Sequence, residues 1–251
     1  MEWIFISPHL DDIALSCGGL VWELTQTGEQ VSIWTICAGE PPVAPISPFA
    51  ESLHTRWQTG AEATQRRRAE DAASCAILGA AYRHFDIPDC IYRFDPFTGS
   101  FFYDSEESLW GQVHPGEANL VEALSRMLAL ETPAAAHLIF PLALGGHVDH
   151  RLARAATAHL ARSPGYYPDY PYALKADDEF SALSRQGWRM ERQPISTAGL
   201  HAWQAAVAAH SSQISTFWSD LPAMHAAIRD YCQRNQGVVL WYPEIEPSLT
   251  G

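Results

Sequence analysis

Two short motifs place histidine and aspartate at spacings that suit a divalent metal ion. Residues 9–12 read HLDD, and residues 147–150 read HVDH. A catalytic zinc site needs three protein ligands of the imidazole or carboxylate type and keeps a fourth position open for water. His9, Asp12 and His150 can supply such a set. The chemistry indicated is hydrolysis, because zinc lowers the pKa of its water toward neutrality and prepares it for attack on a carbonyl.

Two other side chains of these motifs remain for the proton transfers of a hydrolase. Asp11 can take a proton from the water, and His147 can meet the oxyanion that develops on the substrate. Each motif also has an ordinary structural explanation, because an aspartate after a strand often caps the next helix and lone histidines often pack in cores. The occurrence of both motifs directly after expected strands favours the metal site.

The strands expected before each motif place both motifs at one edge of a sheet. Residues 3–6 form a short apolar run that ends just before the first motif, and a helical pattern over 13–26 and a second strand over 30–37 follow. A similar strand over 137–140 precedes the second motif, and a helix over 150–161 follows it. In open parallel sheets, ligands bind outside the carboxyl ends of the strands. We therefore expect an α/β protein with a Rossmann-like, three-layer α/β/α architecture and a mostly parallel sheet.

The rest of the chain fits the same architecture, and we expect one domain over residues 1–251. The alternation continues with a strand over 82–85, and a last strand is expected over 238–241. The C-terminal third, about 173–236, is more helical in pattern. Residues 39–56 are rich in proline and predict a long surface loop, which is a candidate lid.

Composition and charge exclude several classes of protein and partner. The chain has 251 residues, of which 47% are hydrophobic and 18% are charged, so it must bury a core and is not disordered. Its net charge of −13 opposes binding to nucleic acid or to an anionic membrane. Five cysteines without a C-x-x-C pair predict neither a disulfide framework nor a thiolate zinc site. With no recognisable signal or membrane-spanning segment, we expect a cytoplasmic protein with no nucleic acid and no membrane partner.

Three segments resemble the signatures of the LmbE-like, or PIG-L, de-N-acetylases. They are residues 7–19 (SPHLDDIALSCGG), 67–70 (RRAE) and 146–151 (GHVDHR). The resemblance runs in the same order from residue 4 to about residue 172. It implies a Rossmann-like domain that binds zinc and hydrolyses the N-acetyl group of an N-acetylglucosamine-type sugar or conjugate. The attack is then made by metal-bound water with the assistance of an aspartate.

The same resemblance implies roles for a set of residues. The metal ligands are His9, Asp12 and His150, the catalytic residues are Asp11, His147 and Asp149, and the substrate contacts are Arg67 and Asp89. Asp11 corresponds to the general base, and His147 to the residue that stabilises the oxyanion and protonates the leaving amine. Asp149 is expected to orient His147 and to keep its imidazole charged.

Two other functions stay open from the residues alone. One is a metal-dependent amidohydrolase that acts on a different small-molecule amide, and the other is a non-catalytic α/β binding module whose histidines pack in the core. Zn²⁺ is the expected cofactor, and sites of two histidines and one aspartate also accept Fe²⁺ and other divalent metals. The expected partner is a small-molecule N-acetylated amino sugar or its conjugate, and a homo-oligomer is left open.

Three further features have a structural or a functional explanation. Gly18-Gly19 lacks the spacing of a nucleotide-binding loop, so tight helix packing beneath the metal site is expected. The aromatic segment 166–172 fits either a wall that packs on a sugar ring or a crossover loop. His210, followed by residues 211–213 (SSQ), is the C-terminal histidine most open to a role in the site.

Overall fold

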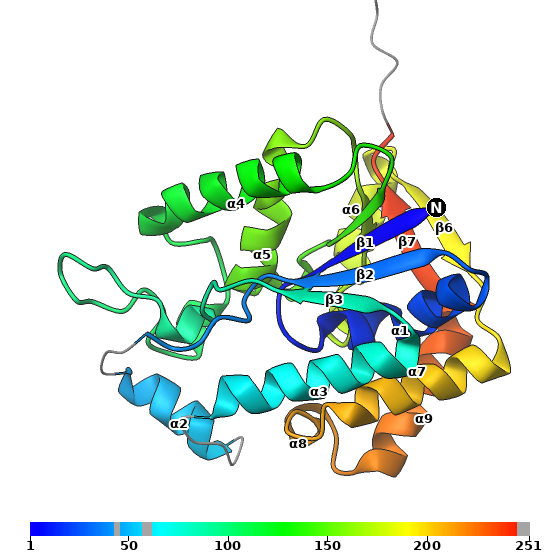
Figure 1. Cartoon of the computed structure of the whole chain (residues 1–251), viewed down its shortest axis with the longest axis horizontal. Helices are drawn as coiled ribbons and strands as arrows, with labels where there is room; N and C mark the ends of the chain where they lie inside the picture. The colour runs from blue at the N-terminus through cyan, green and yellow to red at the C-terminus, as the bar shows by residue number, and fades with distance from the viewer. Residues whose placement is uncertain (43–45, 57–61, 245–251) are drawn as a thin grey trace, which may run out of the picture.

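A computed structural model describes residues 1–42, 46–56 and 62–244 (Figure 1). Its centre is a seven-stranded sheet in the order β3-β2-β1-β4-β5-β7-β6. The strands are β1 (Glu2–Ser7), β2 (Gln30–Thr35), β3 (Ala81–His84), β4 (His137–Pro141), β5 (Gly165–Tyr167), β6 (Arg189–Gln193) and β7 (Val238–Tyr242). The first five pair in parallel, whereas β7 runs antiparallel to both β5 and β6. The mostly parallel α/β fold expected from the sequence is confirmed.

Helices cover both faces of this sheet (Figure 1). One face packs against α1 (Asp12–Gln26), α3 (Ala63–Leu78), α7 (Thr197–Ala209) and α9 (Leu221–Asn235). The other face packs against α4 (Ala118–Glu131), α5 (Val148–Ala155) and α6 (Asp177–Arg185). The remaining helical segments are α2 (Pro48–Arg56), α8 (Ile214–Phe217) and short 3₁₀ helices at Cys90–Tyr92, Glu107–Leu109, Pro115–Glu117, Leu144–Gly146, Ala156–His159 and Tyr172–Lys175.

The central strands β1 and β4 contain uninterrupted apolar runs because both of their faces are buried. Phe5 and Ile139 belong to the core on the side of α1 and α7. Ile4, Leu138 and Phe140 belong to the core on the side of α4 and α5. Successive strand residues point to opposite faces, so a strand covered on both sides needs an unbroken apolar run. This explains why the sequence pattern finds β1 and β4 and the motifs that follow them.

Three elements of the structure are not predicted by the sequence pattern. Residues 48–56 form α2, so the prediction of a loop throughout 39–56 is wrong there, and residues 43–45 lie outside the described residues. β5 has only three residues, too few for a periodic signal. β6 reads RMERQ and lies at the sheet edge, where its side chains are half-buried or exposed. Such a strand lacks the apolar alternation on which the expectation rests.

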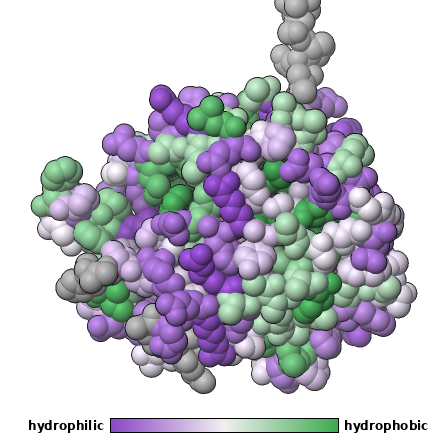
Figure 2. All heavy atoms as spheres, viewed as in Figure 1, coloured by the Kyte–Doolittle hydropathy of each residue, from purple (hydrophilic) through white to green (hydrophobic). Residues whose placement is uncertain are grey.

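The surface of the protein is mixed in polarity, and its cysteines lie inside the fold. Within the described ranges, no helix combines the length and apolar character needed to cross a membrane. Figure 2 shows hydrophilic and hydrophobic residues interspersed over the face seen in Figure 1. All five cysteines are buried as free thiols.

The glycine pair Gly18-Gly19 lets α1 and α7 approach each other closely. A Cβ atom on Gly18 would lie 2.6 Å from Cδ1 of Trp203, and one on Gly19 would lie 2.8 Å from Cε3 of the same indole. Trp203 is fully buried, and its Nε1 donates a 2.7 Å hydrogen bond to the carbonyl of Ala14. The expected tight packing is confirmed, and it fixes the helix at whose start the first motif lies.

Gly18→Ala is expected to lower the free energy of unfolding by about 1–3 kcal/mol, because the added methyl group overpacks against the indole of Trp203. Denaturant unfolding followed by circular dichroism measures the loss. The double variant Gly18→Ala/Trp203→Leu tests the cause, because a smaller side chain at 203 leaves room for the methyl group. The losses of free energy of unfolding in the single variants Gly18→Ala and Trp203→Leu should then sum to more than the loss in the double variant. Strictly additive losses would contradict the contact as the cause.

Candidate active site

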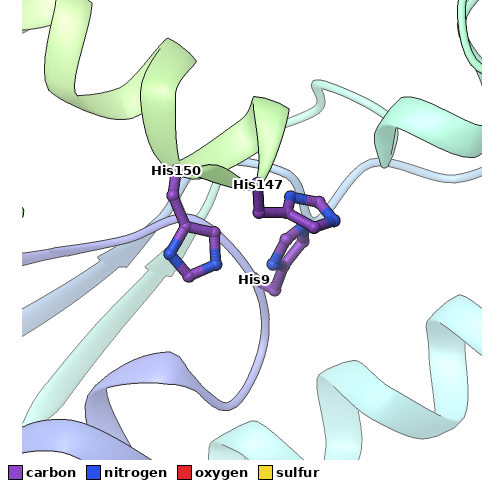
Figure 3. A group of neighbouring side chains, drawn as sticks. All are labelled: His9, His147 and His150. Atoms are coloured by element: carbon purple, nitrogen blue, oxygen red, sulfur yellow. The ribbon is translucent and has the colours of Figure 1, made fainter. Parts of the chain in front are cut away.

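The carboxyl ends of β1 and β4 bring the two motifs together. These strands are neighbours in the parallel part of the sheet, and each is followed by one of the motifs, which begins two residues after β1 and, beyond the short 3₁₀ helix Leu144–Gly146, six residues after β4. Figure 3 shows the rings of His9, His147 and His150 gathered in one space beside the start of α5. One ligand atom from each ring lies within 4.8 Å of the others.

Asp12 lies between two of these histidines at distances that suit a shared metal ion. Its Oδ2 is 3.4 Å from Nδ1 of His9 and 3.5 Å from Nε2 of His150. Ligand atoms of a tetrahedral zinc, each about 2.0–2.1 Å from the ion, are separated by about 3.3–3.4 Å. These two separations therefore suit a shared divalent metal, and His9 and His150 also belong to the group of three histidines whose ligand atoms lie within 4.8 Å of one another. The assignment of these three residues as ligands stays a prediction.

Asp12 is in the charge state that a metal ligand needs. Burial alone would raise the pKa of Asp12, but the imidazoles of His150 and His9 outweigh burial and lower it well below its usual range. The backbone N–H of His9 donates a further 2.7 Å hydrogen bond to Oδ2 of Asp12. Asp12 is therefore an anion at neutral pH, which is the state that binds a metal.

His150 is oriented by a carboxylate that the sequence did not single out. Its Nδ1 lies 2.6 Å from Oδ1 of Asp169, and the other oxygen of Asp169 accepts a 2.9 Å hydrogen bond from the backbone N–H of Leu144. This leaves Nε2 of His150 directed to Asp12. A carboxylate behind a histidine ligand is a common arrangement at metal sites. The only sequence signal for Asp169 is its position just after β5, within the aromatic segment 166–172.

Asp169→Asn is expected to weaken metal binding about 10- to 100-fold, because carboxylates that orient a ligating histidine typically contribute that much. The amide keeps an oxygen for the N–H of Leu144, so the fold should survive. Competition with a chromogenic chelator measures the affinity. Asp177→Asn, on the exposed first turn of α6, is the matched control and should bind metal as the wild type does. An unchanged affinity in Asp169→Asn would rule out this role.

Asp149 contacts other partners than expected. Its Oδ2 lies 3.0 Å from Nε2 of His9, and its Oδ1 lies 2.6 Å from Nη2 of the buried Arg93. The expectation that its carboxylate orients His147 is wrong in this respect. Asp149 instead orients His9, whose Nδ1 is then turned toward Asp12. Arg93 keeps Asp149 ionised, and it lowers the pKa of that carboxyl against the effect of burial.

His147 is neutral rather than charged. Burial and the nearby His9 lower the pKa of His147 to about 3. Its Nδ1 accepts a 3.3 Å hydrogen bond from the backbone N–H of Asp149, so the proton of the neutral ring belongs on Nε2. The expected imidazolium is thus replaced by a neutral ring with an N–H donor. Such a donor still suits the stabilisation of an oxyanion.

Arg67, on α3, connects two carboxylates of the site. Its Nη2 lies 3.5 Å from Oδ1 of Asp11, and its Nη1 lies 3.8 Å from Oδ2 of Asp89. Asp11 occupies the N-cap position of α1, yet its side chain makes no capping hydrogen bond. Helix capping therefore does not explain this carboxylate. Burial raises the pKa of Asp11, and Arg67 opposes the rise.

These side chains face a cavity of about 140 Å³ at the edge of the sheet. Of the residues expected in the site, its lining includes His9, Asp11, Asp12, Arg67, Asp89 and His147. Tyr172 of the aromatic segment 166–172 and Gln213, which follows His210, also line the cavity, and the position of Tyr172 favours the wall over a simple crossover loop. Sequence reasoning missed several others, among them Leu53 of α2, Trp110 and Phe217. The rest come from irregular or helical segments with no distinctive motif.

The turn after α7 reaches this cavity because Glu70 fixes it to α3. Glu70 accepts hydrogen bonds from Oγ of Ser211 (2.7 Å) and from the backbone N–H (2.9 Å) and Oγ (2.6 Å) of Ser212. His210, in the same turn, is buried, and its ring nitrogens have no hydrogen-bond partner among the described residues. The RRAE segment thus supplies Arg67 to the site, and its Glu70 holds the turn after α7 that lines the site.

A family model supports the resemblance seen in the motifs. The model of PIG-L, described as GlcNAc-PI de-N-acetylase, matches residues 4–161. The chain belongs to the PIG-L family. Both motifs and the RRAE segment of this PIG-L protein lie inside the matched range.

Several known proteins similar to this PIG-L protein are deacetylases. The 2'-N-acetylparomamine deacetylase of Streptomyces fradiae is 31% identical over 185 residues, which are 69% of this chain and 58% of that protein. The chain therefore spans less than two thirds of that relative's length. The protein of the same name from Niallia circulans is 29% identical over 218 residues, which are 74% of this chain and 72% of the relative. The zinc-inhibited form of a teicoplanin deacetylase is a similar solved structure, with 25% identity, a TM-score of 0.83 and coverage of 99% of this chain and 100% of that one.

Proposed function

We propose that this PIG-L protein is a metal-dependent N-deacetylase that hydrolyses the acetamide of an N-acetylated amino sugar or its conjugate. One observation carries the proposal. A ligand set of metal-like spacing, formed by His9, Asp12 and His150, lies in the same site as a buried carboxylate, Asp11, and a neutral histidine, His147. A packing role alone does not explain why these five polar side chains share one small site.

The chain's own residues can perform the proton transfers of this reaction. A bound divalent metal supplies a Lewis acid and a water of lowered pKa. Asp11 takes the proton of the attacking water, because its carboxylate faces the cavity and is more basic than a solvated aspartate. Nε2–H of His147 donates to the carbonyl oxygen as negative charge develops there. Asp11 then holds the proton that the departing amine requires.

The substrate class follows from the shape of the site and from the relatives. The cavity of about 140 Å³ is smaller than the roughly 300–1,000 Å³ that encloses a whole drug-sized ligand. It is suited to an acetamide, with the rest of the substrate at its mouth. Two relatives are named as deacetylases of an N-acetylated aminoglycoside, 2'-N-acetylparomamine. We therefore infer an N-acetylated amino sugar in a small molecule as the first substrate to test.

The decisive test combines metal analysis with a substrate panel. Metal content is measured by plasma mass spectrometry, and the protein is then supplied separately with Zn²⁺, Fe²⁺ and Co²⁺. Several metals are needed because a similar deacetylase has been solved in a zinc-inhibited form. Acetate and free amine should appear in equal amounts from N-acetylparomamine or N-acetylglucosamine and not from their N-octanoyl analogues. Release from unrelated amides only would favour a different amidohydrolase, and a protein without metal or activity would favour a binding module.

Trp110→Ala is expected to raise KM about tenfold and to change kcat less, because an exposed indole at the mouth of the site can stack on the apolar face of a sugar ring. Trp110 is 39% exposed, and its ring lies edge-on to His147 and Tyr172 at centroid distances of 5.3 and 5.4 Å. Phe97→Ala, which removes a fully exposed ring outside the site, should have wild-type kinetics. A loss confined to kcat would contradict a role in sugar binding.

A further inference from the structure

A second, larger cavity of about 860 Å³ lies behind the loop that carries His147. Residues 142–146 form one of its walls, and α5 and α6 form others. A Cβ atom on Gly145 would lie 2.9 Å from Cβ of Tyr172, which lines the candidate active site, and one on Gly146 would lie 3.1 Å from Nη2 of Arg151, which lines the second cavity. The loop therefore contacts residues of both cavities.

Two arginines of α5 line this second cavity without an acidic partner. Within the described residues, neither Arg151 nor Arg154 has a carboxylate oxygen within 4.0 Å, although the chain contains 29 acidic residues against 16 basic ones. Glu179 also lines the cavity, but it is exposed and lies beyond ion-pair distance of both. Nε of Arg151 is buried and has no hydrogen-bond partner in the described part of the chain. Buried hydrogen-bond donors in native proteins nearly always have an acceptor, so this donor indicates that a further group binds here.

The second arginine is held in place by its surroundings. Nη1 of Arg154 donates a 2.5 Å hydrogen bond to the carbonyl of Leu142, and its guanidinium lies 5.7 Å from the ring centroid of Tyr166 and 5.8 Å from that of Trp188. Stacking on aromatic rings fixes a guanidinium without neutralising it. The cavity therefore has a positive wall in a protein whose net charge is −13.

We propose that this second cavity is a binding site for a phosphate-bearing small molecule or free phosphate, with Arg151 as its principal contact and Arg154 as a second positive charge. Guanidinium groups bind phosphate through paired, charge-assisted hydrogen bonds. The volume is within the range of sites that enclose a small ligand. The site does not depend on the proposed deacetylase reaction, because none of its residues takes part in that reaction.

Titration calorimetry with inorganic phosphate, at constant ionic strength and on the full chain, tests the proposal. The wild type should show saturable binding, and Arg151→Gln should weaken it about tenfold or more, since a charge-assisted hydrogen bond is lost. Arg151→Lys keeps the charge but not the forked donors and should bind with intermediate affinity. Arg185→Gln, an exposed arginine on α6 outside the cavity lining, should bind as the wild type does. Matching thermal unfolding of the variants excludes misfolding as the cause.

Phosphate bound at the candidate metal site is the competing explanation, and Asp12→Ala separates the two. If phosphate binds in the second cavity, Asp12→Ala retains phosphate binding and Arg151→Gln loses it. The reverse pattern, or no saturable binding in the wild type, overturns the proposal. A repeat with glucosamine 6-phosphate separates two sources of the anion. Tighter binding than inorganic phosphate, still dependent on Arg151, assigns the site to a phosphorylated metabolite, and equal binding assigns it to the free anion.

Discussion

Asp11→Asn loses about 10²- to 10⁴-fold in kcat, the range expected when a general base is removed, while it keeps its fold and its metal. The amide cannot accept the proton of the attacking water at neutral pH. The fold is preserved because the Asp11 side chain makes no capping hydrogen bond to α1. Metal is retained because the ligand spacing is provided by Asp12 and its neighbouring histidines. Steady-state acetate release and metal analysis on the same preparation measure both properties.

The control for Asp11→Asn is the same substitution at an exposed aspartate outside the cavity lining. This variant, Asp104→Asn, should leave kcat unchanged. If Asp11→Asn turned over at close to the wild-type rate, the base would have to be another group. If it lost metal together with activity, the carboxylate would be needed for the metal and not for proton transfer alone.

Asp12→Ala is expected to abolish metal binding and, with it, activity. Oδ2 of Asp12 lies between Nδ1 of His9 and Nε2 of His150, so its removal takes away the central donor of the set. It also leaves the backbone N–H of His9 without its 2.7 Å partner. Plasma mass spectrometry after dialysis should find about one metal ion per wild-type chain and close to none in the variant.

Two controls make the result for Asp12→Ala interpretable. Asp178→Ala, on the exposed start of α6, should keep both metal and activity. Added zinc should not restore the Asp12 variant at concentrations that saturate the wild type. A variant that carried stoichiometric metal would remove Asp12 from the ligand set and favour the cluster of His9, His147 and His150 in its place.

The sequence predicts the parts of the site that follow directly from β1 and β4. These strands are buried on both faces, so their apolar runs are easily recognised, and parallel pairing then places the motifs at 9–12 and 147–150 together. Asp169 escapes prediction because its link to His150 depends on where a three-residue strand, β5, ends in space. No periodicity reveals a strand of that length.

Charge state and partner choice are likewise tertiary properties. Asp149 is two residues from His147 in the chain, which suggested that they interact, yet the start of α5 turns the carboxylate toward His9 and Arg93. The neutrality of His147 follows from its burial among other histidines, which no local pattern encodes. Trp110 reaches the cavity from an irregular segment after the 3₁₀ helix Glu107–Leu109, so no motif marks it.

The packing of Trp203 into the Gly18-Gly19 surface limits how this protein can be engineered. The range that matches the family ends at residue 161, whereas Trp203 lies well beyond it and completes the core beneath the helix that begins at Asp12. A protein fragment limited to the matched range would lack Trp203 and would expose Gly18, Gly19 and the apolar surface of α1 around them to solvent. Chimaeras that graft this segment, with its candidate site, onto another scaffold must therefore carry α7 along with it. Directed-evolution libraries aimed at the loops of the candidate site would for the same reason keep positions 18, 19 and 203 fixed.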